Sequence, residues 1–456
     1  MVVTQEKLHE QYQKDTKLPD GDEVRKLNRP FTPLGRVVSF ISIVLSLLAI
    51  WQFTNRSAYL YFLGGLMLAW LLIKKMFALC YRSCKKELTR EYKVSVILTC
   101  FNEEPASVTT VLAGIMALDY PVHEVIFLDD GSEDPLAYQV AVSFAQEYRN
   151  DPDAPTFHII RFEENRGKRE VMADGFVTAT GDYVFLLDSD VEILPNALTE
   201  LLRPFEDGKT SSVVGNLGVL DKKKNFLTRL QSFSYFGAFQ LGRAAQSVTG
   251  NVVICSGAFS IHKKDFILEH LEAFQDTHTV FGIKVSSGDD RMLTTFSKKA
   301  GGKARFQNTA YGETTVPDTW RKFLKQRRRW QRSGYLSCLQ TIKILFPKHW
   351  GHMLFSFAES YFWMISTIIF IALIVNRGYL YIDWRDMIRY FLIITYMHNI
   401  FYMYYKPVRF LLAPIYFLVY GVFLTVVRVY TLLTLTNDSW GTRADEEPAF
   451  SEESEI

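Results

Sequence analysis

The sequence predicts an α/β domain with a mostly parallel sheet, embedded between α-helical transmembrane segments. Three observations favour this architecture: long apolar runs near both ends of the chain, strand-like runs that alternate with helical periodicity in the middle, and acidic clusters after several of those strands. Strands that alternate with helices build right-handed βαβ units around a parallel sheet. Such sheets bind ligands outside the carboxyl ends of their strands, so the acidic clusters indicate where a site should lie.

Composition narrows the class of protein. The 456 residues are enough for a full-sized core and a second structural region. The formal net charge is only +2, so bulk electrostatics give no reason to expect a nucleic acid partner. The five cysteines form no Cys-x-x-Cys pair. This pattern predicts neither a disulfide framework nor a zinc site, and favours reduced thiols facing a cytosol.

The N-terminal part is predicted to be a polar cytoplasmic extension, residues 1–35, followed by two transmembrane helices within 36–82. The extension is not a cleavable signal peptide, because the first apolar run begins only at Val37. The apolar runs 37–53 and 59–80 are each close to the roughly 20 residues that cross a bilayer.

The C-terminal region, 351–436, is predicted to add three or four membrane segments, and 437–456 a cytoplasmic tail. The apolar runs there are 353–375, 387–405 and 409–435. Pro414 and Gly421 interrupt the last run, so it could cross once obliquely or form two half-segments inside a protein-lined cavity.

Basic residues are distributed unevenly around the first two spans. Seven lysines and arginines precede the first span, the connector 54–58 holds only Arg56, and four more follow the second span. The positive-inside rule then places the N-terminus and the central domain in the cytoplasm. The prediction is a multi-pass protein of the plasma or inner membrane, in contact with membrane lipids.

Three charged residues interrupt the apolar runs. Lys74 and Lys75, late in the second run, could extend to the aqueous interface. Glu359 lies within the third run and should face a partner or a hydrated channel rather than lipid. A Lys–Glu pair between the two spans is therefore a hypothesis, and Glu359 is a candidate channel residue.

The central region, 90–318, is predicted to be a cytoplasmic α/β domain. Its predicted strands are 94–98, 125–128, 157–160 and 183–187. Polar residues follow three of these strands directly, and helical periodicity separates them. The polar residues should therefore meet at one edge of the sheet.

Two acidic pairs at that edge have distinct predicted roles. Asp129 and Asp130 could accept hydrogen bonds from a nucleoside base and ribose. Asp188 and Asp190, two residues apart, can share a divalent cation with a diphosphate, and hard oxygen ligands suit Mg²⁺ or Mn²⁺. The segment 165–169 precedes a predicted helix whose N-terminus, with its basic residues, would suit a phosphate. Its alternative interpretation is a surface charge run.

A third acidic cluster, Asp289-Asp290-Arg291, precedes another helix-like stretch. Asp290 could deprotonate an acceptor hydroxyl for in-line attack on an anomeric carbon, while a metal stabilises the departing diphosphate. One displacement inverts the anomeric centre, so an α-linked donor would give a β-linked product. The competing interpretation is a pair of aspartates that cap a helix.

Two segments are predicted to be amphipathic helices at the membrane interface, residues 226–243 and 319–342. A core helix is the alternative for the first. The second belongs to a region, 319–350, that carries a Gln-x-x-Arg-Trp pattern at Gln326, Arg329 and Trp330.

Longer motifs identify a family. They are Arg243 to Asn251 (Arg-Ala-Ala-Gln-Ser-Val-Thr-Gly-Asn) with Cys255-Ser256-Gly257, then Gly288-Asp289-Asp290-Arg291, Gln326-x-x-Arg329-Trp330 and Trp440-Gly441-Thr442-Arg443. As an ordered set, over residues 37–443, the chain resembles the processive family-2 glycosyltransferases. Within these, the 243–257 stretch and the Trp-Gly-Thr-Arg ending resemble membrane hyaluronan synthases of the streptococcal and vertebrate type.

The resemblance implies a GT-A-like nucleotide-sugar transferase domain and a role for each matched position. Asp129 and Asp130 would contact uridine, Lys168, Arg169 and Asp188 would bind the nucleotide sugar, Asp190 would hold Mg²⁺ or Mn²⁺, and Asp290 would be the catalytic base. The diphosphate and the acceptor sugar would be bound by the remaining matched residues, Cys255, Ser256, Gly257, Asp289, Arg291, Gln326, Arg329 and Trp330.

The implied reaction is alternate transfer from UDP-GlcNAc and UDP-GlcA to a growing polysaccharide that leaves through the enzyme's own membrane helices. The sequence departs from the family at Ala258-Phe259, where relatives usually have Pro-Leu, and at Arg327 and Arg328, where bacterial relatives are less basic. The alternative is another UDP-amino sugar and a one-sugar polymer, of the N-acetylmannosamine O-antigen or chitin-like type. A transporter with an inactive transferase domain is not favoured, because no acidic position is lost.

Overall fold

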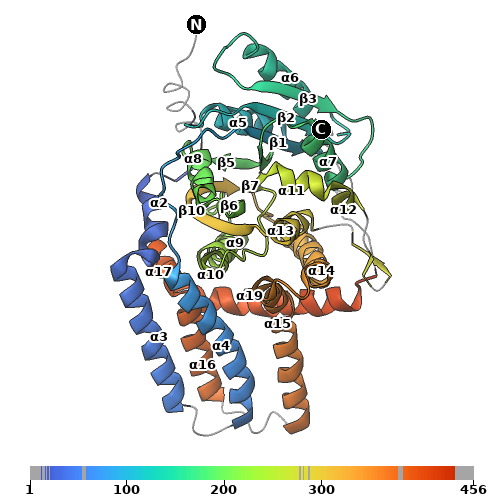
Figure 1. Cartoon of the computed structure of the whole chain (residues 1–456). Helices are drawn as coiled ribbons and strands as arrows, with labels where there is room; N and C mark the ends of the chain where they lie inside the picture. The colour runs from blue at the N-terminus through green and yellow to red at the C-terminus, as the bar shows by residue number, and fades with distance from the viewer. Residues whose placement is uncertain are drawn as a thin grey trace, which may run out of the picture.

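A computed structural model gives the fold (Figure 1). It describes residues 12, 16, 18–19, 21–53, 58–276, 279–280, 282–285, 288–377 and 384–436. The Trp440–Arg443 motif, the predicted tail 437–456 and residues 1–11 of the N-terminal extension lie outside these residues. An α/β domain stands at one end of the molecule, and the helices α3, α4, α15 and α16 extend from its other side.

The first half of the central sheet is parallel, as the sequence predicts. Its strands, in the order β3-β2-β1-β4, are β1 (Val94–Cys100), β2 (Glu124–Asp129), β3 (Thr156–Arg161) and β4 (Tyr183–Asp188). Alternate residues of β1 join different cores: Val96 and Leu98 pack with α5 (Pro105–Met116), and Ile97 packs with α7 (Lys168–Thr178).

The second half makes the sheet mixed, so the prediction of a mostly parallel sheet is wrong there. The eight-stranded order continues from β4 through β7 (Phe259–Lys263), β6 (Thr210–Val219) and β10 (Lys303–Thr314) to β5 (Val191–Ile193). β7 runs antiparallel to both β4 and β6, and β5 antiparallel to β10. The chain therefore enters β7 from the carboxyl end of β4, which brings residues 256–258 to that end.

Helices occupy every predicted apolar run. They are α3 (Pro33–Phe53), α4 (Ala58–Cys80), α15 (Trp350–Arg377), α16 (Trp384–His398), α17 (Ile400–Tyr405), α18 (Pro407–Phe410) and α19 (Ala413–Leu433). Among the described residues, α19 alone is long and apolar enough to cross a bilayer as one helix, and the bent segment from Glu23 to Leu48 is at most a second candidate. The arrangement of five or six spans therefore stays a prediction.

The C-terminal runs differ from the prediction in two ways. The predicted segment 387–405 is divided at Asn399 into α16 and α17. The run 409–435 contains one continuous helix through Gly421, with Pro414 in its first turn, so two half-segments are excluded for α19. In Figure 1, α19 runs across the direction of α3, α4, α15 and α16, beneath the α/β domain.

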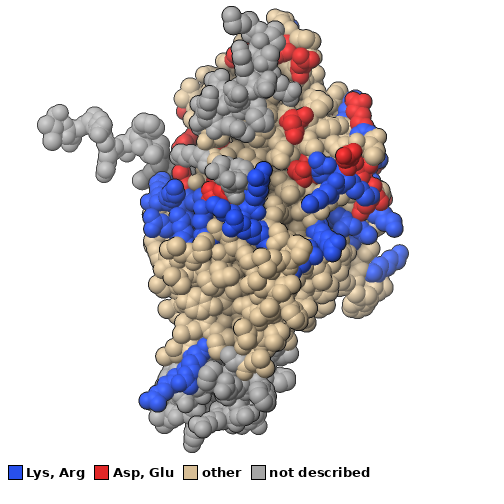
Figure 2. Space-filling model, turned by 90° about the vertical axis from the view of Figure 1, so that its left-hand side faces the viewer, with Lys and Arg blue, Asp and Glu red and all other residues tan. Residues whose placement is uncertain are grey.

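Charge is layered along the molecule. Figure 2 shows lysines and arginines gathered in a belt between the α/β domain and a lower band with almost no charged side chains on the visible face. The segments α2 (Gly21–Asn28) and η1 (Arg29–Phe31), which lead into α3, carry the exposed Arg25 and Arg29. This layering is typical of a protein whose basic residues face the cytoplasmic leaflet.

The segment 226–243 is a core element rather than a surface helix. It forms α9 (Phe226–Phe236) and the π-helical η3 (Gly237–Arg243). The Phe233 ring stacks on Tyr402 and Tyr416 with ring centroids 3.9 and 5.0 Å apart. The core-helix alternative is therefore right, and α9 connects the sheet to α17 and α19.

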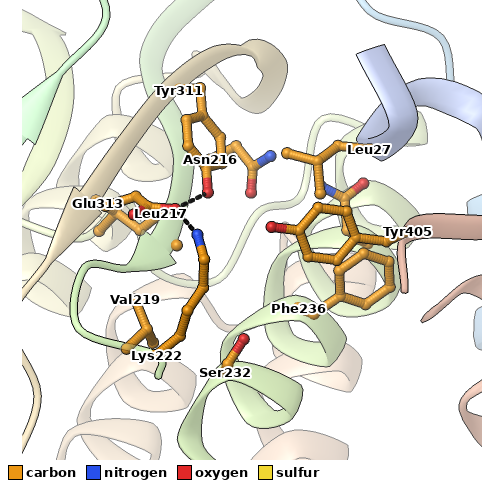
Figure 3. A pocket seen from close by; sticks show the side chains of 12 residues that line it. Leu27, Asn216, Leu217, Val219, Lys222, Ser232, Phe236, Tyr311, Glu313 and Tyr405 are labelled. Atoms are coloured by element: carbon orange, nitrogen blue, oxygen red, sulfur yellow. Dashed lines mark hydrogen bonds and ion pairs between the residues drawn. The ribbon is translucent and has the colours of Figure 1, made fainter. Parts of the chain in front are cut away.

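A small cavity of about 20 Å³ lies where β6, β10, α9, η3, α2 and α17 meet (Figure 3), which is room for about one water. Fully buried Glu313 accepts hydrogen bonds there from the Tyr311 hydroxyl (2.7 Å) and the Lys222 ammonium (2.6 Å). Glu313 Oε2 and Gln240 Oε1 are buried without a protein partner, and both residues line the cavity. A water in the cavity would satisfy both oxygens.

Replacing Glu313 by Gln should lower the free energy of unfolding by about 3 kcal/mol, because Lys222 keeps a largely buried charge without its counter-ion. Thermal unfolding of the detergent-solubilised protein measures this effect. The matched control is Asp318→Asn, which removes the partner of Lys224 from an exposed ion pair and should cost less than about 1 kcal/mol. Equal losses in the two variants would contradict the structural role of the buried pair.

Candidate functional site

The aspartates after β2 are held by the protein itself. Asp129 is fully buried, accepts hydrogen bonds from the hydroxyl and backbone N–H of Ser132, and pairs with Arg161 at 3.1 Å. Asp130 accepts the backbone N–H groups of Arg166 (2.7 Å) and Gly167 (2.9 Å). Burial raises the pKa of Asp130 above its ordinary value, against the effect of these two donors. The pair therefore fixes the loop that leads into α7.

Consecutive residues in the first turn of α7 connect two walls of the site. Lys168 Nζ lies 2.6 Å from Asp188 Oδ1 at the end of β4, and Arg169 Nε lies 2.7 Å from Asp289 Oδ1 at the start of α13 (Asp289–Lys299). Burial opposes the charge on Lys168, but Asp188, Asp290 and Asp289 together raise its pKa above the ordinary lysine value. The segment 165–169 is thus part of the site and not a surface charge run.

Asp188 and Asp190 provide oxygen ligands of the kind that hard divalent cations prefer. Asp190 accepts a hydrogen bond from the Thr315 hydroxyl at 2.5 Å, which orients its carboxylate. In the described part of the chain, no three His, Cys, Asp or Glu side chains gather as a closed metal cage. Proteins commonly bind Mg²⁺ through one or two carboxylates, and the phosphates of the substrate supply further ligands. Asp188 and Asp190 therefore fit such an ion.

Asp290 lies at the start of α13, next to the loop that leads into β7. The Cβ position of Gly257 is 4.0 Å from the Asp290 carboxylate, and the backbone N–H of Asp188 donates to the next carbonyl, Ala258. Burial raises the pKa of Asp290, Lys168 lowers it, and Asp289 and Asp188 raise it further; the net shift is upward. A carboxylate with a raised pKa is a better proton acceptor than an ordinary aspartate.

Gly288 fixes where α13 begins. Its φ of +102° is in the left-handed region, and a Cβ there would come within 2.7 Å of Ser333 on α14 (Trp320–Leu345). The cap residue is thus a glycine without a side chain, and the capping interpretation of Asp289 and Asp290 is not supported. Asp289 instead binds Arg169.

Two residues that the resemblance assigns to substrate face the protein interior. Arg291 is buried, and its Nη1 donates to Ser356 Oγ on α15 at 2.7 Å. Cys255 is fully buried, its backbone N–H donates to Thr294 Oγ1 at 2.8 Å, and burial raises the pKa of its thiol to about 12. Both residues support α13 in this structure, whereas Ser256 is partly exposed and Gly257 lies next to the Asp290 carboxylate.

The Gln-x-x-Arg-Trp segment lies in the first half of α14. The Trp330 side chain is 42% exposed, so a broad aromatic face is available. Gln326 Oε1 is buried without a hydrogen-bond partner, and the Arg329 side chain is exposed. Burial raises the pKa of the Tyr235 hydroxyl on α9. Arg327 lowers this pKa, whereas Tyr420, Asp190 and Asp188 raise it further.

The Lys–Glu pairing between two apolar helices is confirmed. Lys74 Nζ on α4 lies 2.6 Å from Glu359 Oε1 on α15. Lys75 is fully buried and donates to the His398 carbonyl at 3.2 Å, so it has a separate role. Glu359 is one turn from Ser356, the partner of Arg291, so the pair stands close to the helix that carries Asp290.

The structure brings six of the predicted site residues to one place. Lys168, Arg169, Asp188, Gly257, Asp289 and Asp290 form a continuous cluster. Sequence reasoning missed Arg161 and Thr315. Arg161 was detectable in principle, because it stands beside Asp129 in the register of β3 and β2. Thr315 follows β10, a strand for which no expectation existed.

Comparisons with known proteins agree with this arrangement. The sequence model described as glycosyl transferase family 2 matches residues 95–271. The hyaluronan synthase of Streptococcus pyogenes is 32% identical over 418 residues, which are 89% of this chain and 96% of that protein. An N-acetylglucosaminyltransferase of Mesorhizobium japonicum is 30% identical over 253 residues, 55% of this chain and 58% of that protein.

A solved structure shares the fold. It is a mannosyltransferase of Pyrobaculum calidifontis in complex with GDP-mannose and Mn²⁺, with a TM-score of 0.55 and 18% identity, covering 83% of this chain and 97% of that one. The predicted nucleotide-sugar transferase fold is therefore confirmed, with a mixed sheet in place of a mostly parallel one.

Proposed function

Because the chain belongs to the hyaluronan synthase family of family-2 glycosyltransferases, we propose that it polymerises UDP-activated sugars into a β-linked polysaccharide and extrudes the product across a membrane. The substrates are UDP-GlcNAc and UDP-GlcA, added in alternation. The single observation that carries the proposal is the position of Asp290: a partly exposed carboxylate with a raised pKa, 4.0 Å from the Cβ position of Gly257 and close to the Lys168–Asp188 pair.

The residues divide the transfer between them. Lys168 and the N-terminus of α7 hold the diphosphate of the donor, and Asp129 and Asp130 hold the loops around the uridine. Asp290 takes the proton from the acceptor hydroxyl as its oxygen bonds to the anomeric carbon. In the same step the bond from that carbon to the diphosphate breaks, UDP leaves with the bonding electrons, and the anomeric centre is inverted.

A divalent cation fits this site. Asp188 and Asp190 would hold Mg²⁺ or Mn²⁺, which when bound supplies positive charge to the departing diphosphate. Thr315 keeps the Asp190 carboxylate in place for this role.

The acceptor and the membrane path lie on the other side of Asp290. Trp330 offers an exposed ring on which an acceptor sugar can stack, with Gln326 and Arg329 beside it. The helices α3, α4, α15 and α16 form the membrane part, and the Lys74–Glu359 pair neutralises two charges where the product passes. The belt of lysines and arginines in Figure 2 would face the cytoplasmic leaflet.

The purified enzyme with Mg²⁺ or Mn²⁺, given each UDP-sugar alone and then both together, tests the proposal. UDP release and polymer should require both donors, and hyaluronidase should digest the product. Polymer from one amino-sugar donor would instead favour the one-sugar alternative. Absence of UDP release with every donor would contradict glycosyl transfer itself.

A further inference from the structure

Arg327, one of the two basic departures within the Gln-x-x-Arg-Trp segment, is held between aromatic rings. Its guanidinium carbon lies 4.5 Å from the centroid of the Trp330 ring, 5.0 Å from that of Phe323 and 5.5 Å from that of Tyr420. Phe323 and Trp330 are one turn away on α14, whereas Tyr420 comes from α19. Cation–π contacts of this kind hold the planar group in a fixed orientation.

The edge of the guanidinium is unused. Nε and Nη2 are both buried and have no hydrogen-bond partner. In the described part of the chain, no carboxylate forms an ion pair with Arg327. Nε and Nη2 form one edge of the planar guanidinium group, here called the Arg327 fork. The parallel N–H bonds of this edge match the two oxygens of a carboxylate. A buried charge without a partner is costly, so an oriented and vacant fork points to an anionic ligand.

The fork stands on the acceptor side of the site. Trp330, the exposed ring that suits a sugar face, is in direct contact with the Arg327 guanidinium. The basic residues on the nucleotide side, Lys168 and Arg169, are instead paired with Asp188 and Asp289 across the site.

We propose that Arg327 is a carboxylate subsite that binds the uronic acid unit of the growing chain next to Trp330. This inference rests on the proposed function and goes beyond it, because it assigns the recognition of the acidic sugar to one residue. A chain of neutral amino sugars would leave the fork empty. The extra arginine would thus select an alternating acidic polymer and hold it between additions.

Binding of defined oligosaccharides to the full-length protein tests this. The probes are a hyaluronan hexasaccharide and the same hexasaccharide with its carboxyl groups reduced to alcohols, measured by calorimetry without any donor. The unmodified protein should bind the acidic probe about tenfold more tightly, as expected for one charge-assisted contact. Arg327→Gln should reduce that ratio to about one, and Arg327→Lys, which keeps the charge without the fork, should lie between them.

The matched control is Arg328→Gln, which removes one positive charge at the next position. The Arg328 guanidinium lies 5.3 Å from the Tyr430 ring centroid, on a different side of α14. This variant should keep the tenfold ratio, and all variants should bind UDP as the unmodified protein does. An unchanged affinity ratio in Arg327→Gln would overturn the assignment. A variant that keeps the ratio but binds UDP more weakly would also overturn it, because Arg327 would then bind the diphosphate.

The two proposals fail in different ways. If the unmodified protein makes a one-sugar polymer, the proposed function is wrong. If it makes hyaluronan while Arg327→Gln keeps the ratio, only the subsite is wrong. The thermal unfolding midpoint of each variant separates a lost contact from a lost fold.

Discussion

Replacing Asp290 by Asn should lower sugar transfer by about a thousandfold, since a positioned general base contributes roughly 10²–10⁴ to a rate. The amide cannot accept the proton of the acceptor hydroxyl, whereas its size and shape are nearly those of the carboxylate. UDP release per enzyme, with both donors and Mn²⁺ present, measures the loss. Affinity for UDP should stay close to that of the unmodified enzyme, because the proposed nucleotide contacts involve Asp129, Asp130 and Lys168 and not Asp290.

The pH dependence gives a second test of Asp290. Burial raises its pKa, and a base works only when it is deprotonated. The value of kcat/KM should therefore fall as the pH drops through an apparent pKa above the ordinary aspartate range. The residual activity of Asp290→Asn should lack this acidic limb. A variant that keeps a tenth or more of the normal rate would remove Asp290 from the role of base.

Reversing the charge at Glu359, by Glu359→Lys, should destabilise the folded protein by about 1–3 kcal/mol, because the largely buried Lys74 would face a like charge in place of its counter-ion. The combination Lys74→Glu with Glu359→Lys restores opposite charges and should recover most of the folded protein. Size-exclusion profiles and thermal unfolding midpoints in detergent measure both effects, and polymer synthesis shows whether the path is restored.

Lys75 provides the control for this exchange. Its ammonium donates to the His398 carbonyl, so Lys75→Glu should not rescue Glu359→Lys. If the Lys74 double variant behaves no better than Glu359→Lys alone, the pair does not act as a unit.

The parts of the fold that follow from local pattern were predictable. Each early strand is a short apolar run that ends in polar residues, and β1 to β4 lie where these runs lie. The order beyond β4 was not predictable, because β7 pairs with strands far away in the chain and carries no signal for its direction. The path of α19 was also hidden, since an apolar run has the same composition whether its helix crosses a bilayer or lies across other helices.

The candidate site could likewise be predicted only in part. Strand ends were enough to predict one edge for Asp188 and Asp190, whereas Asp290 begins a helix and its place beside Lys168 and Gly257 depends on the tertiary fold. Which partner each side chain takes depends on tertiary contacts: Asp289 binds Arg169, and Arg291 binds Ser356 on a helix more than sixty residues away. In the sequence, Arg327 stood out only as a departure from the bacterial relatives. Its contact with Tyr420 of α19, which completes the aromatic surroundings of the guanidinium, could not be predicted from the sequence.

The adjacent ion pairs of Lys168 and Arg169 have a consequence for the order of binding. Lys168 pairs with one oxygen of Asp188, a carboxylate that would also hold a divalent cation. A cation bound to Asp188 would compete with that ammonium, and a diphosphate bound to Lys168 would compete with that carboxylate. With both ligands present, Asp188 would hold the cation and Lys168 would hold the diphosphate. Each ligand should therefore strengthen the other by the same factor, and an enzyme starved of either one would hold the remaining one weakly.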